Sequence, residues 1–148
     1  MVELMSHDLN SVFLYIHPTT AIIGYAFVII SLILIAYNLK SSPKVKPINY
    51  QRISIFISWF FNLLGIITGM LWAQLAWGSY WSWDPKETVT LIIFILVCLA
   101  VVAYEKGEKK ITFIILTLAL ISIIVNVLIT LGNYGLHSYG EFIFNVYN

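Results

Sequence analysis

The sequence offers two histidines that could together hold a metal, one on each side of a tryptophan-rich segment. His17 comes just before the first long apolar stretch, and His137 follows the last one, among three glycines that permit a tight turn. Two neutral imidazoles in this arrangement suit axial ligation of a haem iron. His7, the third histidine, is interpreted as a polar residue at a helix end. The single cysteine, Cys98, rules out an internal disulfide, a multi-cysteine zinc site and a CxxCH attachment motif within this sequence.

Four tryptophans fall within twelve residues of the segment between these histidines. They are Trp72, Trp77, Trp81 and Trp83. Tryptophan accumulates at membrane–water interfaces, but this density also offers flat apolar walls to a planar hydrophobic ligand. If the chain is extended at this point, the alternate spacing of Trp81 and Trp83 places both rings on one side.

The residues that follow the tryptophans are typical of a helix start. Asp84 fits the N-cap position, Pro85 the first helical position and Glu87 the third, as in a capping box. This interpretation is favoured over catalytic carboxylates. A helix beginning here, and a first helix expected to begin after Pro18, would direct the positive ends of their dipoles to the same side. Together with Lys86, these ends suit anionic groups such as carboxylates.

Membrane-spanning helices are the elements expected to position these residues. Of the 148 residues, 60% are hydrophobic and 10% are charged, and the mean hydropathy is +0.90. A soluble domain carries about a quarter charged residues. Four segments have the roughly 20 apolar residues that a crossing helix needs, at about 19–39, 53–76, 88–104 and 111–131. The sequence therefore predicts an all-α membrane protein, a single domain over residues 1–148 that forms an antiparallel bundle of four transmembrane helices.

The positions of the basic residues predict the orientation of this bundle. Seven of the eight lie in two loops, Lys40, Lys44, Lys46 and Arg52 in the first and Lys106, Lys109 and Lys110 in the third. The positive-inside rule then places both loops in the cytoplasm and both termini, with the tryptophan-rich loop, outside the plasma membrane. The first fifteen residues lack the basic region of a signal peptide, so the whole chain is expected to be mature. A net charge of +1 gives no electrostatic footprint for nucleic acid.

Small and polar residues within the predicted spans indicate close helix packing. Gly65 and Gly69 form a GxxxG pattern, which lets helices approach closely in lipid. Asn62, Gln74 and Asn126 are expected to hydrogen-bond between helices.

The segment Trp77-Gly-Ser-Tyr-Trp-Ser-Trp-Asp-Pro-Lys-Glu-Thr88, here called the WWD loop (residues 77–88), closely resembles a known signature. It is similar to the tryptophan-rich WWD motif of the cytochrome c assembly family, the haem-handling membrane proteins of the CcmC, CcmF and CcsA type. The sequence of the loop is most similar to that of the CcsA type, and residues 135–140, Gly-Leu-His-Ser-Tyr-Gly, resemble the segment that follows in that type. The resemblance extends from His17 to His137.

The resemblance implies a haem site on the extracytoplasmic face of the membrane. In the family, the loop cradles haem and two external histidines ligate the iron, which correspond here to His17 and His137. The loop residues carried over are Trp77, Trp81, Trp83 and Asp84, and Lys86 is the candidate partner for the haem propionates. The haem would be b-type, bound non-covalently and transiently. It would be passed, directly or through a carrier, toward apocytochrome c.

Two departures from the family define the expected role more closely. Members usually have six or more spans, and the larger ones carry histidines inside the membrane, whereas no histidine lies between His17 and His137. The chain is therefore interpreted as a minimal module that delivers haem with partner subunits, such as other maturation subunits or a haem chaperone, rather than as a complete haem ligase. The alternatives are a b-type haem or quinone-linked membrane anchor subunit and a cofactor-free scaffold subunit.

Overall fold

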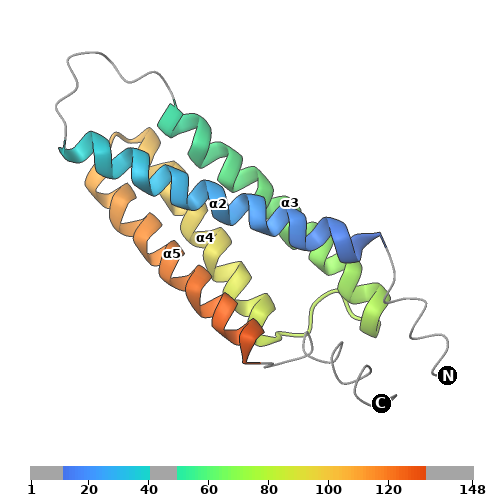
Figure 1. Ribbon diagram of the computed structural model, residues 1–148. Coiled ribbons are helices and arrows are strands. Elements are labelled where there is room, and N and C mark those ends of the chain that lie inside the picture. The colour runs from blue at the N-terminus through green and yellow to red at the C-terminus, as the bar shows by residue number, and fades with distance from the viewer. Residues whose placement is uncertain (1–11, 41–49, 133–148) are drawn as a thin grey trace.

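The computed structural model describes residues 12–40 and 50–132, and four long helices account for most of them (Figure 1). The helices are α2 (Phe13–Lys40), α3 (Tyr50–Trp77), α4 (Pro85–Glu105) and α5 (Lys109–Leu131). Each is long and apolar enough to cross a membrane, so the all-helical, multi-pass architecture is as predicted. Every helix contains its predicted span and extends past it at one or both ends. The 28 residues of α2 and of α3 measure about 42 Å at about 1.5 Å per residue, so their ends reach the polar interface.

The helices lie side by side along a common direction, and they pack most extensively as two pairs, α2 with α3 and α4 with α5 (Figure 1). One end of the bundle is held by polar contacts between neighbouring helices. Arg52 of α3 forms an ion pair with Glu105 of α4 at 2.7 Å, and the Lys109 ammonium donates to the Asn38 side-chain oxygen at 3.3 Å. We call this the basic end, because five of the six described basic residues lie here: Lys40, Arg52, Lys106, Lys109 and Lys110. The WWD loop joins α3 to α4 at the opposite end, the WWD end.

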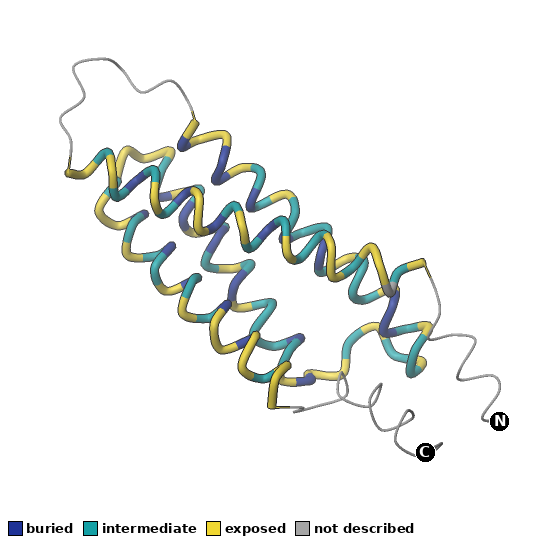
Figure 2. Tube along the Cα trace, viewed as in Figure 1, coloured by how far each residue is buried: buried dark blue, intermediate teal, exposed yellow. Residues whose placement is uncertain are grey.

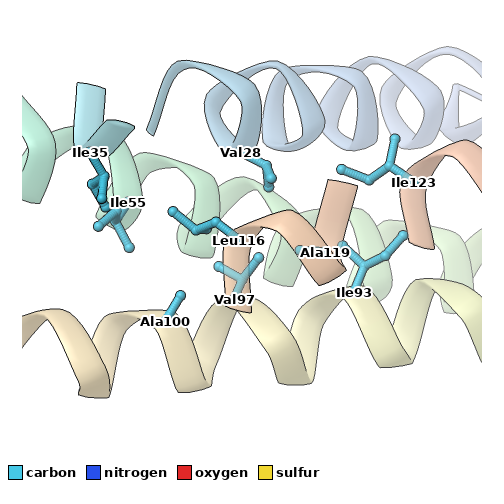
Figure 3. Packing of buried hydrophobic residues seen from close by; sticks show 9 residues of the cluster. All are labelled: Val28, Ile35, Ile55, Ile93, Val97, Ala100, Leu116, Ala119 and Ile123. Carbon is cyan, nitrogen blue, oxygen red and sulfur yellow. The ribbon is translucent and has the colours of Figure 1, made fainter. Parts of the chain in front are cut away.

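The core runs between the helices as a cluster of nine buried apolar residues, which Figure 3 labels: Val28, Ile35, Ile55, Ile93, Val97, Ala100, Leu116, Ala119 and Ile123. The three core residues of α4 are spaced by four and three residues and so share one face of that helix, and the three core residues of α5 likewise share one face of theirs. Large apolar side chains also cover the outside of every helix, where exposed residues follow the outer faces (Figure 2). An apolar outer surface of this kind is typical of helices that are surrounded by lipid.

The start of α2 differs from the expectation that the first helix begins after Pro18. The helix begins at Phe13, and Pro18 lies inside it. Two threonine hydroxyls donate to carbonyls of this turn, from Thr19 to Tyr15 at 2.7 Å and from Thr20 to His17 at 2.8 Å. Pro18 is only five residues from the start of α2, and its missing N–H removes one helical hydrogen bond, the one to the Leu14 carbonyl. His17 is consequently part of α2, and the helix dipole begins at Phe13 instead of after Pro18.

Candidate functional site

His17 is fixed against α3 by a hydrogen bond from its ring. Its Nδ1 lies 2.9 Å from the backbone carbonyl oxygen of Gly65. A carbonyl can only accept, so Nδ1 carries the hydrogen, and in the neutral ring Nε2 then holds the lone pair. Metal-binding histidines use this arrangement, in which one nitrogen is tied to the protein and the other ligates. The contact therefore leaves Nε2 of His17 as the atom able to bind a metal.

Gly69 and Trp72 complete the setting of the His17 ring. A Cβ atom added at Gly69 would stand 2.8 Å from both Cε1 and Nδ1 of His17, so only glycine lets the ring lie so close to the α3 backbone. The indole of Trp72 is parallel to the imidazole within 5°, with ring centroids 6.3 Å apart. The predicted close approach at the GxxxG pattern is confirmed. At Gly69, the group that approaches α3 is the His17 ring. At Gly65, an added Cβ atom would lie 3.5 Å from Ala21, an ordinary contact distance.

Sequence reasoning missed this supporting role of α3, although a signal was present. Gly65, Gly69 and Trp72 are spaced by four and three residues, which places them on a single face of a helix. The GxxxG pattern by itself predicts only close helix packing, and Trp72 lies next to the other tryptophans in the sequence although it belongs to α3. The placement of His17 outside the first helix concealed the connection, because α2 must extend past Pro18 for the ring to reach this face.

The tryptophans form two ring pairs. Trp72 and Trp77 meet edge to face with centroids 4.9 Å apart, so that Trp77 adjoins the group around His17. Trp81 and Trp83 also meet edge to face, at 5.9 Å. The two rings meet as expected, but the expected reason does not apply, because the backbone of Trp83 has a φ of +58° and is not extended. The indole of Trp83 is 70% exposed, so the WWD loop presents an aromatic surface at this end of the bundle.

Asp84 and Glu87 form the predicted capping box at the start of α4. The Asp84 side chain accepts from the Lys86 amide at 2.9 Å, and the Glu87 side chain accepts from the Asp84 amide at 3.3 Å. Both carboxylates are almost fully buried. They occupy the start of α4, one of the two helix starts that were expected to receive an external anion, whereas Lys86 and the start of α2 stay predicted for that purpose. Lys86 also lies within electrostatic range of His17.

The three polar residues expected to link helices behave differently. Asn126 of α5 donates to the Thr90 hydroxyl of α4 at 2.9 Å and lies 3.4 Å from the Lys86 carbonyl, which confirms its interhelical role. Asn62 instead donates to the Ser58 carbonyl of its own helix at 2.8 Å, and its amide is packed against Gly24 of α2. For Gln74 the role stays a prediction.

The second histidine of the predicted ligand pair, His137, lies outside the described residues, as does His7. Its ligation of the iron stays a prediction. The described part of the site therefore consists of His17 with its support on α3, the WWD loop and the start of α4.

Comparison with known proteins places the chain in a family. The family model described as "Cytochrome C assembly protein" matches residues 3–143. The cytochrome c biogenesis protein CcsA of Chlamydomonas reinhardtii is 35% identical over 156 aligned residues, which cover 90% of this chain and 42% of the relative. CcsA of Guizotia abyssinica is 39% identical over 111 residues, covering 71% of this chain and 34% of the relative. CcsA of Prochlorococcus marinus (strain MIT 9303) is 31% identical over 108 residues, covering 71% and 33%.

The chain thus spans between a third and about two fifths of the length of these relatives. No solved structure matches it. The family model covers nearly the whole sequence, and the relatives share one name. The chain belongs to the cytochrome c assembly protein family, in agreement with the resemblance of its WWD loop.

Proposed function

We propose that this protein binds haem at its WWD end and hands it on during cytochrome c maturation, together with partner subunits. Membership of the cytochrome c assembly family supports the process. The observation that carries the site is the hydrogen bond from His17 Nδ1 to the Gly65 carbonyl, because it holds Nε2 as a metal ligand at the end of the bundle where the tryptophans gather.

The described residues fit an amphipathic macrocycle with a metal centre and two carboxylates. Nε2 of His17 suits the metal, and the WWD loop offers apolar ring surfaces. The indole nitrogen of Trp81 is buried and has no hydrogen-bond partner within residues 12–40 and 50–132, so this site has a donor that a ligand oxygen would satisfy. Lys86 supplies a positive charge for a propionate. When bound, haem would supply two kinds of reactive group: an iron that imidazole can ligate, and vinyl groups that can react with cysteine thiols.

The orientation proposed for the protein places the WWD end on the extracytoplasmic side. The five basic residues of the basic end would then face the cytoplasm, as the positive-inside rule requires. In this orientation the helices alternate in direction across the plasma membrane, and both termini of the chain lie outside. Lipid would cover the apolar outer faces of the bundle.

Each site residue has a distinct task in this proposal. His17 and His137 hold the iron, the latter as a prediction from sequence. Trp77, Trp81 and Trp83 cover apolar parts of the ring system, at about 25 cal/mol for each Å² removed from water. Asp84 fixes the start of α4, and Lys86 faces a propionate. The hold is non-covalent, so the haem can leave when a recipient competes for it.

Partner subunits are part of the proposal because the loop between Trp77 and Pro85 is short and offers little surface to a soluble acceptor. They would supply the surface that binds apocytochrome c, or pass the haem through a chaperone. Haem delivery is proposed in preference to thioether formation by this chain alone.

The test is an absorption spectrum of the detergent-purified, haem-replete protein. The wild type is expected to show a Soret band with the visible bands of bis-imidazole haem. His17→Ala should lose this spectrum and regain a six-coordinate one when imidazole is added, because the free ligand can replace the missing ring. His137→Ala should behave likewise, and His7→Ala is the matched control that should keep the wild-type spectrum.

Two results would contradict the proposal. A wild type with no Soret band would favour a cofactor-free scaffold subunit. A bound haem that is rapidly reduced by quinol and is insensitive to His17→Ala would favour a membrane anchor subunit for electron transfer.

A further inference from the structure

Trp83 adopts a backbone conformation that large side chains rarely accept. Its φ of +58° is the only positive φ at a non-glycine residue in the described part of the chain. A bulky residue in this left-handed region is strained, and such strain persists only where the surrounding structure holds it in place. The same residue is 70% exposed, so burial of its indole does not compensate for the strain.

The carboxylate of Glu87 is the group that holds this segment. One oxygen of Glu87, Oε2, accepts from the backbone amide of Ser82 at 2.8 Å and from that of Asp84 at 3.3 Å. These are the amides on either side of Trp83. Two nearby amides that converge on one anion form a nest, a geometry that a left-handed residue between them creates. The Ser82 hydroxyl adds contacts of 3.3 and 3.2 Å to the two carboxylate oxygens.

These contacts exceed what helix capping requires. From the Glu87 side chain, a capping box needs only the bond to the amide of Asp84, and the Asp84 side chain supplies the reciprocal bond. The shorter bond runs to Ser82, which lies outside the helix and before Trp83. The Thr88 hydroxyl, at 3.4 Å from the carbonyl of Trp83, adds a weaker contact from the same turn of α4. Glu87 thus links the first turn of α4 to the backbone that carries the exposed indole.

We propose that Glu87 is a positioning residue, whose carboxylate keeps the Ser82–Asp84 backbone in the conformation that presents the Trp83 indole to haem. The proposal rests on the haem site proposed above. Trp83 provides an exposed apolar face beside the ring of Trp81, and its strained backbone fixes the direction of that face. Without the carboxylate, the segment relaxes and the indole leaves its position.

The experiment combines a measurement on haem-free protein with a haem titration, both on the full chain in detergent. Glu87→Gln keeps the size of the side chain and one accepting oxygen, so α4 retains its cap. Hydrogen exchange at the amides of Ser82 and Asp84 should accelerate about tenfold, because bonds to a charged acceptor are replaced by weaker ones. Haem affinity should fall about tenfold as well. Glu105→Gln, at the other end of the same helix, is the matched control and should change neither quantity.

Two further variants separate the carboxylate from the indole. Trp83→Asn removes the indole but tolerates the left-handed backbone, so it should lower haem affinity and leave exchange at Ser82 slow. In the double variant Glu87→Gln with Trp83→Gly, the strain is gone, and exchange should return toward the wild-type rate while haem affinity stays low.

The outcomes distinguish this proposal from the haem proposal beneath it. Unchanged exchange in Glu87→Gln would overturn the positioning role, whether or not haem binds. Faster exchange with unchanged haem affinity would also overturn it, because Trp83 would then have no part in the site. If the wild type binds no haem, the haem site itself fails, and the exchange measurements still report on the hold of Glu87 over the loop.

Discussion

The two helix pairs of this bundle are held together by different interactions. Between α2 and α3, hydrogen bonds recur along the whole length of the pair: Gln51 to the Leu34 carbonyl, Ser31 to Ser54, Ser58 to the Gly24 carbonyl, Thr20 to Thr68 and His17 to the Gly65 carbonyl. Between α4 and α5, the core residues are apolar, and Asn126 supplies polar contacts near the WWD end (Figure 3). The pair with directional bonds is the one that carries His17.

Hydrogen bonds between two helices can fix the position of a metal-binding side chain at the end of a long membrane helix. Lipid is as apolar as leucine, so apolar packing between helices gains stability through shape and contact rather than through the hydrophobic effect. Such packing tolerates small shifts along the helix axis. Hydrogen bonds between specific groups on α2 and α3 do not tolerate such shifts, so they fix the position of His17 along the helix axis. We therefore expect substitutions in the α4–α5 pair to affect stability and substitutions in the α2–α3 pair to affect the site.

The largest effect on stability is expected from Leu116→Ala in the α4–α5 pair. Leu116 is fully buried in the core, so its truncation leaves a cavity that should cost about 2 kcal/mol of unfolding free energy, the lower end of the range for Leu→Ala, because transfer from water does not contribute in lipid. The haem spectrum should keep its shape, because His17 is held by α3. Unfolding in mixed detergent micelles, followed by circular dichroism, measures the first quantity. Leu118→Ala, at a 47% exposed position on the same helix, is the control and should be nearly neutral.

A Leu116→Ala protein that folds but has lost the Soret band, while Leu118→Ala keeps it, would show that the two pairs do not act separately. The division of the bundle into one pair that sets stability and one pair that sets the site would then be wrong.

The next largest effect is expected from Gly69→Ala in the α2–α3 pair. The new methyl group would overlap the His17 ring at 2.8 Å and force it away from Gly65, so haem affinity should fall about 10- to 100-fold, as for loss of a partner of a metal-bound histidine. Gly65→Ala is the matched control in the same helix, since its methyl group meets Ala21 at an ordinary 3.5 Å. Haem titration of both variants provides the measurement. Equal affinities for the two variants would sink the assigned role of Gly69.

Much of the fold could be predicted from the sequence because a membrane imposes simple requirements. A helix must cover the hydrocarbon core with apolar residues, so hydropathy alone located all four helices. The start of α4 was equally predictable, since Asp84, Pro85 and Glu87 are local signals that act within one turn. The resemblance of the WWD loop identified the family, which the family model confirms.

The setting of His17 was less accessible because it depends on contacts between distant segments. His17 and Gly65 are 48 residues apart, and no local sequence pattern predicts that the His17 ring contacts the Gly65 carbonyl on another helix. The expected start of the first helix was also wrong, because proline usually occupies the first turn of a helix, whereas α2 begins at Phe13 and continues through Pro18. The strained backbone of Trp83 had no signal either, since tryptophan is not a residue that turn rules place at positive φ.

A smaller effect is expected from the hydrogen bond between Ser31 and Ser54, whose hydroxyl oxygens are 2.9 Å apart. Both residues are buried between α2 and α3. A double-mutant cycle with Ser31→Ala and Ser54→Ala should give a coupling free energy of about 0.6 kcal/mol, the average for such bonds in a membrane protein. The unfolding assay described for Leu116 applies here. Ser122, whose hydroxyl donates to the Leu118 carbonyl of its own helix, provides the control, and the cycle of Ser31 with Ser122 should show no coupling.

The smallest effect is expected from the ion pair between Arg52 and Glu105, which joins the two helix pairs at the basic end. It has good geometry, with bonds of 2.7 and 3.1 Å, but the side chains are 51% and 40% exposed. Exposed pairs contribute about 0–1 kcal/mol, and salt screens them, so Arg52→Gln should lower stability slightly at low salt and not at all at high salt. Lys106→Gln changes the same charge without breaking this pair and serves as control. A large, salt-independent loss for Arg52→Gln alone would mean that the joint between the pairs, rather than the packing within each, sets the stability of the bundle.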